Sequence, residues 1–91
     1  MLIIKAMDLH LILKHKWYDM IEADIKKEEY RKICDYYEHK IWQKRKEIEN
    51  VVFHRGYTNT TMKKKVNEIV CKPGKTGWGA EEGVYYYVIR F

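Results

Sequence analysis

The sequence predicts an α+β fold, a mixed and partly closed β-barrel of about five or six strands with two main helices outside it. Three observations lead to this prediction. Apolar residues alternate at positions 9, 11 and 13, which is the period of a strand that covers a core. After residues 15 and 33, apolar residues recur every three or four positions, which indicates helices. The tyrosine-rich alternating run over residues 84–91 is typical of a closing strand. The 91 residues are enough for a single domain over residues 1–91 with a modest core.

The composition favours a polyanionic partner. The chain carries 18 Lys and Arg against 13 Asp and Glu, which gives a formal net charge of +5. Cys34 and Cys71 stand in no metal-binding spacing, so we expect a reducing cytoplasmic location and no disulfide. The apolar run over residues 1–7 is too short for a signal peptide or a membrane span and is compatible with a short leading strand. We predict no membrane association, no metal and no cofactor.

A short amphipathic helix is predicted after the first strand, over residues 15–23. Trp17, Met20 and Ile21 fall at the i, i+3, i+4 spacing of one helical face, and we expect Trp17 to anchor the core. Lys14 and Lys16 flank the start of this helix, where cations oppose the helix dipole. Either an anion such as phosphate binds there, or both side chains lie in a solvated loop.

The run over residues 25–31 is predicted to be a strand, although it is crowded with charge. Lys26, Glu29 and Arg31 leave neither face of the strand cleanly hydrophobic. The run is therefore either an edge strand whose charges deter aggregation or a strand that lines a polar cleft. In the cleft interpretation, Glu29 and Arg31 share one face and pair on the cleft floor, while Lys26 reaches the rim from the opposite register.

A second helix is predicted over about residues 35–47, where Tyr37 and Ile41 lie on one helical stripe. Asp35 and Glu38 have the spacing of a capping box at its start. After it, residues 51–53 are apolar on both faces and predict a central strand. The following strand, over about residues 60–71, carries three successive lysines at positions 63–65, which is typical of a solvated edge.

The predicted central strand delivers His54, Arg55 and Tyr57 to its end. This basic and aromatic group suits contacts with phosphates and bases, although a single histidine is more often structural. The loop over residues 72–83 holds Trp78 between two glycines. Either this flexible backbone lets a planar ligand approach the ring, or the ring plugs the open end of the barrel. A phosphate-loop interpretation of the same loop fails, because Ile69 stands where that motif needs glycine.

Four blocks of the sequence, at residues 10–21, 26–31, 51–57 and 77–80, together resemble the small ASCH-domain proteins of bacteria and their phages. The signature of that family ends in a lysine, a glutamate and an arginine, which match Lys26, Glu29 and Arg31 here. The glycine that opens the signature is replaced by Asp24. Because Asp tolerates a left-handed turn better than most residues, we expect the turn between helix and strand to be kept. The resemblance implies a PUA-like fold.

The resemblance and the charge together predict a nucleic-acid-binding domain, whose partner is RNA or another single-stranded nucleic acid. In this interpretation a basic cleft surrounds Lys26, Glu29 and Arg31, and its aromatic side chains stack on bases. The predicted phosphate-binding residues are Lys14, Lys16, Lys26, Arg31 and Arg55. The predicted aromatic and neighbouring contacts are Tyr57, Trp78 and His54.

The alternative is a small amidohydrolase that acts on an acylated or otherwise modified nucleoside, as some ASCH proteins do. Lys26 matches the lysine that this activity requires, and its pKa would have to be lowered. The threonine three residues later is Glu29 here, so Lys26 and Glu29 are the candidate catalytic residues. Ribonuclease activity, also found in the family, is a further alternative.

Overall fold

The computed structural model describes residues 6–91, whose strands form two three-stranded sheets. In the first sheet, β1 (Met7–Leu13) pairs in parallel with β3 (Ile48–Arg55), which pairs antiparallel with β4 (Thr61–Lys65). In the second sheet, β6 (Tyr85–Arg90) lies in the middle and pairs antiparallel with β2 (Glu28–Lys32) and β5 (Glu68–Pro73). The leading strand predicted over residues 1–7 lies outside the described residues, apart from the start of β1.

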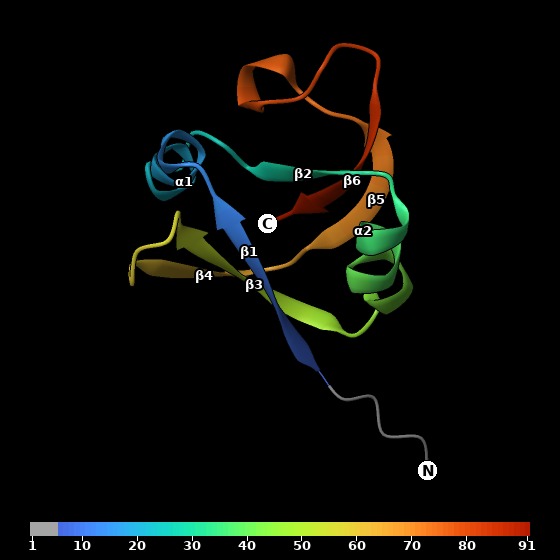
Figure 1. Cartoon of the computed structure of the whole chain (residues 1–91), viewed down its shortest axis with the longest axis horizontal. Helices are drawn as coiled ribbons and strands as arrows, with labels where there is room; N and C mark the ends of the chain where they lie inside the picture. The colour runs from blue at the N-terminus through green and yellow to red at the C-terminus, as the bar shows by residue number, and fades with distance from the viewer. Residues whose placement is uncertain (1–5) are drawn as a thin grey trace.

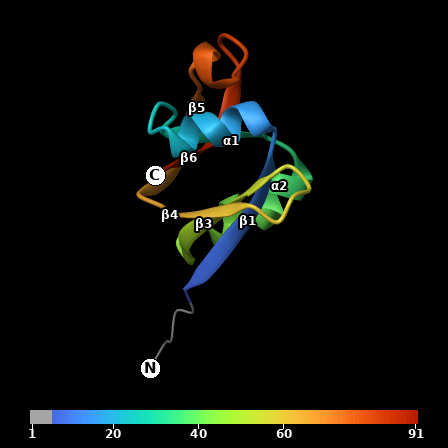
Figure 2. The same cartoon turned by 90° about the vertical axis from the view of Figure 1, so that its left-hand side faces the viewer.

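Two α-helices accompany these sheets. Helix α1 (His15–Glu22) follows β1, and α2 (Asp35–Lys40) follows β2. Two short 3-10 helices, η1 (Trp42–Lys44) and η2 (Thr76–Trp78), lie after α2 and in the loop before β6. Figure 1 shows α1 and α2 on opposite sides of the molecule, and the turned view of Figure 2 shows the first sheet below α1 and the η2 loop above it.

These elements confirm an α+β fold with six strands and two main helices in the described residues. The two sheets share no strand among residues 6–91, so backbone pairing does not close a barrel there. The hydrophobic core joins both sheets. It combines the alternating leucines of β1 with Val51 and Phe53 from β3 and Ile89 from β6. The period-two alternation at residues 9, 11 and 13 therefore predicted the buried face of β1 correctly.

Helix α1 buries a different residue from the one we expected. Tyr18 and Ile21 fill the core at i, i+3 spacing, whereas Trp17 is only partly buried, so the prediction that Trp17 anchors the core was wrong. The Trp17 ring instead lies against Gly79 of the η2 loop. The predicted left-handed turn after this helix is confirmed, because Asp24 has a φ of 63°.

The signature strand begins at Glu28, three residues later than predicted, since the N–H groups of Ile25 and Lys26 donate to the Met20 carbonyl of α1. Helix α2 ends at Lys40 and continues as η1, so the predicted helix is shorter. Its N-cap is Cys34 and no described side chain caps it, so the capping box at Asp35 does not form.

The strand predicted over residues 60–71 is two strands. The chain leaves the first sheet after Lys65 and enters the second sheet at Glu68. At the junction, Val66 N–H donates to the Glu49 carbonyl and Asn67 N–H donates to the Arg90 carbonyl. This switch of partners satisfies the backbone without a turn at residues 66–67. It depends on the second sheet, which the local sequence did not indicate.

Candidate functional site

Three charged side chains between positions 26 and 29 are buried. Lys26 has no exposed surface, and Glu28 and Glu29 are almost as enclosed. The Lys26 Nζ lies 3.2 Å from the Glu29 Oε1 and also donates to the Glu28 carbonyl oxygen. The rings of Trp17 and Tyr30 face the same ammonium group, at 5.7 and 4.7 Å from the ring centroids. Lys26 therefore lies inside the protein, and the prediction that it reaches the rim of a cleft was wrong.

Glu29 connects Lys26, which precedes β2, to Arg31, which lies on the same face of β2 as Glu29. Its Oε2 accepts a hydrogen bond of 2.8 Å from Arg31 Nη2, so the predicted Glu29 and Arg31 pair forms. Arg31 also donates to the Ile12 carbonyl at 3.0 Å and to the Tyr37 hydroxyl at 3.1 Å. The guanidinium therefore joins β2 to β1 and α2, and its orientation is fixed by three elements.

Burial acts differently on the two cations. It lowers the pKa of Lys26, and the attraction of Glu29 offsets this only in part. Burial also opposes charge on Arg31, but Glu29 and the Tyr37 hydroxyl outweigh it and raise the Arg31 pKa. Arg31 is consequently a permanent cation, while Lys26 is the member of the network that gives up its proton more readily.

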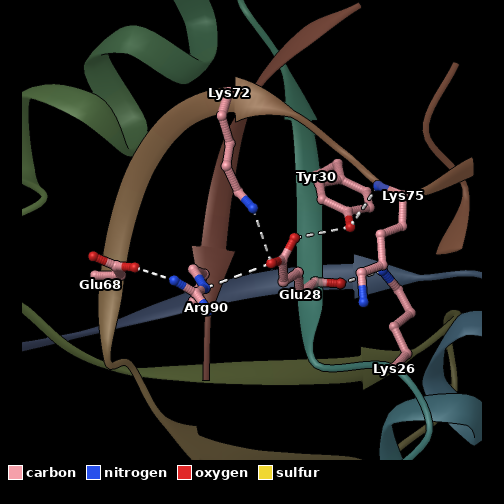
Figure 3. Close-up of polar contacts among 7 residues, drawn as sticks. All are labelled: Lys26, Glu28, Tyr30, Glu68, Lys72, Lys75 and Arg90. Carbon is pink, nitrogen blue, oxygen red and sulfur yellow. Dashed lines mark hydrogen bonds and ion pairs between the residues drawn. The ribbon is translucent and has the colours of Figure 1, made fainter. Parts of the chain in front are cut away.

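The other face of β2 carries a second polar cluster, drawn in Figure 3. The Glu28 carboxylate accepts hydrogen bonds from the Tyr30 hydroxyl at 2.9 Å and from Lys72 Nζ at 3.2 Å, and Arg90 Nε lies 3.5 Å from it. The Tyr30 oxygen accepts a hydrogen bond from the Lys75 N–H. Burial raises the pKa of Tyr30 to about 12, assisted by Glu28, so this phenol stays protonated at neutral pH.

A cleft of about 430 Å³ opens beside the Glu28 cluster, and we call it the tryptophan cleft. Its lining residues are Lys27, Glu28, Asn67, Glu68, Lys75, Trp78, Arg90 and Phe91. Two acids balance most of its three cations, and Arg90 pairs with both Glu68 and Glu28. Lys75 Nζ lies 4.2 Å from the Trp78 ring centroid, so it covers part of that ring. The charges of this cleft are largely paired within the protein.

A second cleft of about 420 Å³ lies between β1, β3 and α2, and we call it the histidine cleft. Its lining residues are His10, Leu11, Ile12, Arg31, Tyr36, Tyr37, Lys40 and His54. None of these described lining residues is acidic. The His10 Nδ1 and the His54 Nε2 lie 2.8 Å apart, within hydrogen-bonding distance. Tyr36 and Ile12 expose about half of their surface or more, at 62% and 48%. This cleft combines cationic, aromatic and apolar groups.

The structure brings together only part of the predicted site. Lys26, Glu29 and Arg31 form one chain of ion pairs, and Arg31 meets His54 in the histidine cleft. Trp78 lines the tryptophan cleft instead, and the described linings of the two clefts share no residue. Figure 1 places the η2 loop, which carries Trp78, on the far side of β2 from α2.

The remaining predicted residues line neither cleft in the described structure. Lys14 and Lys16 are exposed, and Lys16 lies over the Trp17 ring. Tyr57 is 96% exposed. Arg55 forms two hydrogen bonds with the Asp19 carboxylate, at 2.8 and 2.9 Å, and this pairing lowers the pKa of Asp19. Arg55 is thus held by an acid rather than free for a phosphate.

Of the residues that line the two clefts, the sequence analysis placed only Arg31, His54 and Trp78 in a functional site. The lining residues that it missed include His10, Glu28, Tyr36 and Lys40. The outward position of His10 on the alternating first strand was a usable signal. The i, i+4 spacing of Tyr36 and Lys40 was another, because it places the Lys40 Nζ near the Tyr36 ring, 5.5 Å from its centroid. The burial of Glu28 had no local signal.

No protein-family model, curated protein or solved structure matches this chain. No helix within residues 6–91 is long and apolar enough to cross a membrane. The same residues contain no cluster of three His, Cys, Asp or Glu side chains that could hold a metal ion.

Proposed function

We propose that this protein binds single-stranded nucleic acid, RNA in the first place, through the histidine cleft. The observation that carries the proposal is the composition of this cleft. It presents Arg31, Lys40 and two imidazoles with no acid among its described lining residues, beside the exposed Tyr36 ring. Arg31 is paired with Glu29, whereas Lys40 takes part in no ion pair among the described residues. A cation without an ion pair attracts phosphates, and an exposed aromatic ring stacks on a base of any sequence. The net charge of +5 adds long-range attraction.

The setting of Arg31 supports a ligand-binding role. Its guanidinium is fixed by Glu29, the Ile12 carbonyl and the Tyr37 hydroxyl, so little side-chain entropy is lost when it binds. Its Nε is the one buried side-chain nitrogen or oxygen among residues 6–91 that has no hydrogen-bond partner. A buried donor is almost always satisfied, and an ordered water or a ligand atom would each satisfy this one.

The hydrolase alternative is supported less well by the geometry. A catalytic amine must reach the reacting carbon of its substrate. The Lys26 Nζ has a lowered pKa, as that chemistry requires, but it is fully buried between Glu28, Glu29 and two aromatic rings. The described linings of the two clefts do not include Lys26. These observations favour a role for Lys26 in holding β2 in place.

Within this proposal, the two sheets are the walls of a PUA-like, partly closed barrel, and the protein is a cytoplasmic ASCH domain. The parallel pairing of β1 with β3 and the core shared by both sheets support this arrangement. The Lys26, Glu29 and Arg31 chain of ion pairs supports it further, since all three signature residues take part.

Fluorescence anisotropy of a labelled oligouridylate tests the proposal, with oligothymidylate measured in parallel. We expect Lys40→Gln to weaken binding and to flatten the slope of log K against log salt by about 0.7, the value for one contact with a single strand. Tyr36→Ala should cost about 1–3 kcal/mol and leave the slope unchanged, because stacking releases no counterions.

The tryptophan cleft provides matched controls for both variants. Lys75→Gln removes one cation and Trp78→Ala removes one aromatic ring outside the histidine cleft. If these two variants weaken binding while Lys40→Gln and Tyr36→Ala do not, the nucleic acid binds at the tryptophan cleft and the proposal is wrong.

Arg55 supplies a further prediction, because Asp19 holds it in a two-point ion pair. Asp19→Asn should release Arg55 for a phosphate, raise the affinity for oligouridylate and steepen the salt slope by about 0.7. Glu82→Gln is the control, since it removes the same charge without breaking an ion pair of the described residues. Equal effects of the two variants would mean that only net charge matters.

A further inference from the structure

We propose that the His10 and His54 pair makes nucleic-acid binding proton-coupled, so that the histidine cleft takes up a proton when it binds a phosphate. This inference rests on the function proposed above and concerns the regulation of that same site. It predicts that affinity increases as the pH falls through the range in which histidine titrates.

The geometry of the pair limits how many protons it holds. His10 on β1 and His54 on β3 are two positions apart in the parallel register, since Ile12 lies opposite His54. Their ring nitrogens are 2.8 Å apart and their ring centroids 5.1 Å apart. At that distance one nitrogen donates a hydrogen and the other accepts it. Two imidazolium rings would point two N–H groups at each other, so the closed pair carries at most one positive charge.

Two other cations line the cleft beside the histidine pair. Arg31 from β2 and Lys40 from α2 line the same cleft as the two imidazoles, together with Tyr36 and Tyr37. The nearby acids are already engaged. Glu29 binds Arg31 and Lys26, and Asp8 binds Lys63 of β4 and the amide of Asn50. These contacts lower the pKa of Asp8. Asp8 is close enough to attract His10, but it shares its charge with Lys63, so the described acids balance two cationic imidazoles only in part.

A phosphate in the cleft changes this balance. It supplies the negative charge that the lining lacks, accepts hydrogen bonds from both rings once they separate, and so favours the doubly protonated pair. The bound state then holds more protons than the free state. By linkage the affinity rises as the pH falls, by up to about tenfold per pH unit for each proton taken up. Histidine is the side chain that titrates in this range without a large perturbation.

The test is oligouridylate binding at constant ionic strength between about pH 5.5 and pH 8, because uracil does not titrate there. We expect the wild-type affinity to rise at least about tenfold towards the acidic end. His10→Gln and His54→Gln should each reduce that rise to less than about threefold, since each leaves one imidazole without its partner. Far-UV circular dichroism checks that both variants are folded.

The two other histidines provide the matched controls. His15 lines none of the three pockets described, and His39 lies outside the histidine cleft, in a third pocket with Tyr36 and Lys40, where it bonds the Asp35 carbonyl of its own helix. Neither ring belongs to the His10 and His54 pair. His15→Gln and His39→Gln should therefore keep the full pH dependence. If they abolish it instead, protonation elsewhere drives the effect and the inference is wrong.

Calorimetry provides a second readout that does not depend on variants. Titrations near pH 6.5 in two buffers of different ionisation enthalpy count the protons taken up, and we expect about one for each bound oligonucleotide. Binding that depends on Lys40 but takes up no proton and is independent of pH would overturn this inference alone. An absence of binding at every pH would overturn the proposed function as well.

Discussion

Replacing Glu29 by glutamine probes the buried ion pairs that hold β2 in place. Glutamine has the same shape, so the change removes a negative charge without leaving a cavity. It leaves two cations beside a neutral amide. Lys26 has no exposed surface and 3.2 Å separates it from Glu29, while Arg31 is 2.8 Å from the other carboxylate oxygen.

The expected cost follows from the burial of these partners. Breaking a buried ion pair from one side costs about 3–5 kcal/mol, because the remaining charge stays desolvated. Arg31 keeps its bonds to Ile12 and Tyr37, and Lys26 can release its proton because burial already lowers its pKa. We therefore expect a loss of about 3 kcal/mol, at the lower end of that range and a large part of the usual 5–15 kcal/mol of folding stability.

Urea denaturation measures this loss as a shift of the midpoint at constant m-value. This loss of stability should become smaller as the pH rises towards the ordinary lysine pKa of about 10.4. In that range Lys26 is still protonated in the unfolded chain but has lost its proton in the folded variant, and a rise in pH then favours the folded state. Lys26→Met combined with Glu29→Gln should recover stability relative to Glu29→Gln alone. The double-mutant cycle should give a coupling of about 1–3 kcal/mol.

Two results would refute this reasoning. A stability of Glu29→Gln within about 0.5 kcal/mol of the wild type would mean that the charges are solvated, and additive effects of the two substitutions would mean that they do not interact. Oligouridylate binding per folded molecule is a separate measurement on the same variant. Unchanged binding would restrict Glu29 to a structural role.

Three further predictions concern the core, the η2 loop and the alkaline limit of stability. Ile89→Ala should cost about 2–5 kcal/mol in urea denaturation, since Ile89 has no exposed surface, whereas Ile25→Ala, at a 58% exposed position, should stay within about 0.5 kcal/mol. Gly79→Ala should lower the free energy of unfolding more than Gly83→Ala does. Both glycines have a positive φ, but only at Gly79 would an added Cβ meet a ring, that of Trp17 at 3.1 Å. Equal losses of stability in the two variants would contradict this prediction. The ionisation of Tyr30 should lower the free energy of unfolding as the pH rises from 10 to about 12, because this phenol ionises in the unfolded chain before it ionises in the folded protein. Tyr30→Phe should remove this decline, which amounts to at most about 2–3 kcal/mol, and denaturation midpoints in alkaline buffers will show it.

The sequence alone determined the features that depend only on residues close to one another along the chain. The alternation of leucines on β1 predicted its buried face, because side chains of a strand point to opposite sides whatever the strand pairs with. Asp24 adopts the expected left-handed turn after α1, since Asp tolerates that conformation better than most residues. The two main helices followed from the same kind of local period, whereas the division of residues 60–71 into β4 and β5 did not. The pairing of Glu29 with Arg31 agrees with their two-residue spacing.

The tertiary structure decided which of these elements meet. The parallel pairing of β1 with β3 brings His10 within 2.8 Å of His54, 44 positions away, and β2 adds Arg31 to the same cleft. Lys26 is buried because the rings of Trp17 and Tyr30 enclose it. Trp78 lies in the tryptophan cleft and not in the histidine cleft, because the η2 loop lies on the opposite side of β2 from α2. The choice of strand partner depends on packing across the whole core, and a local period carries no information about it.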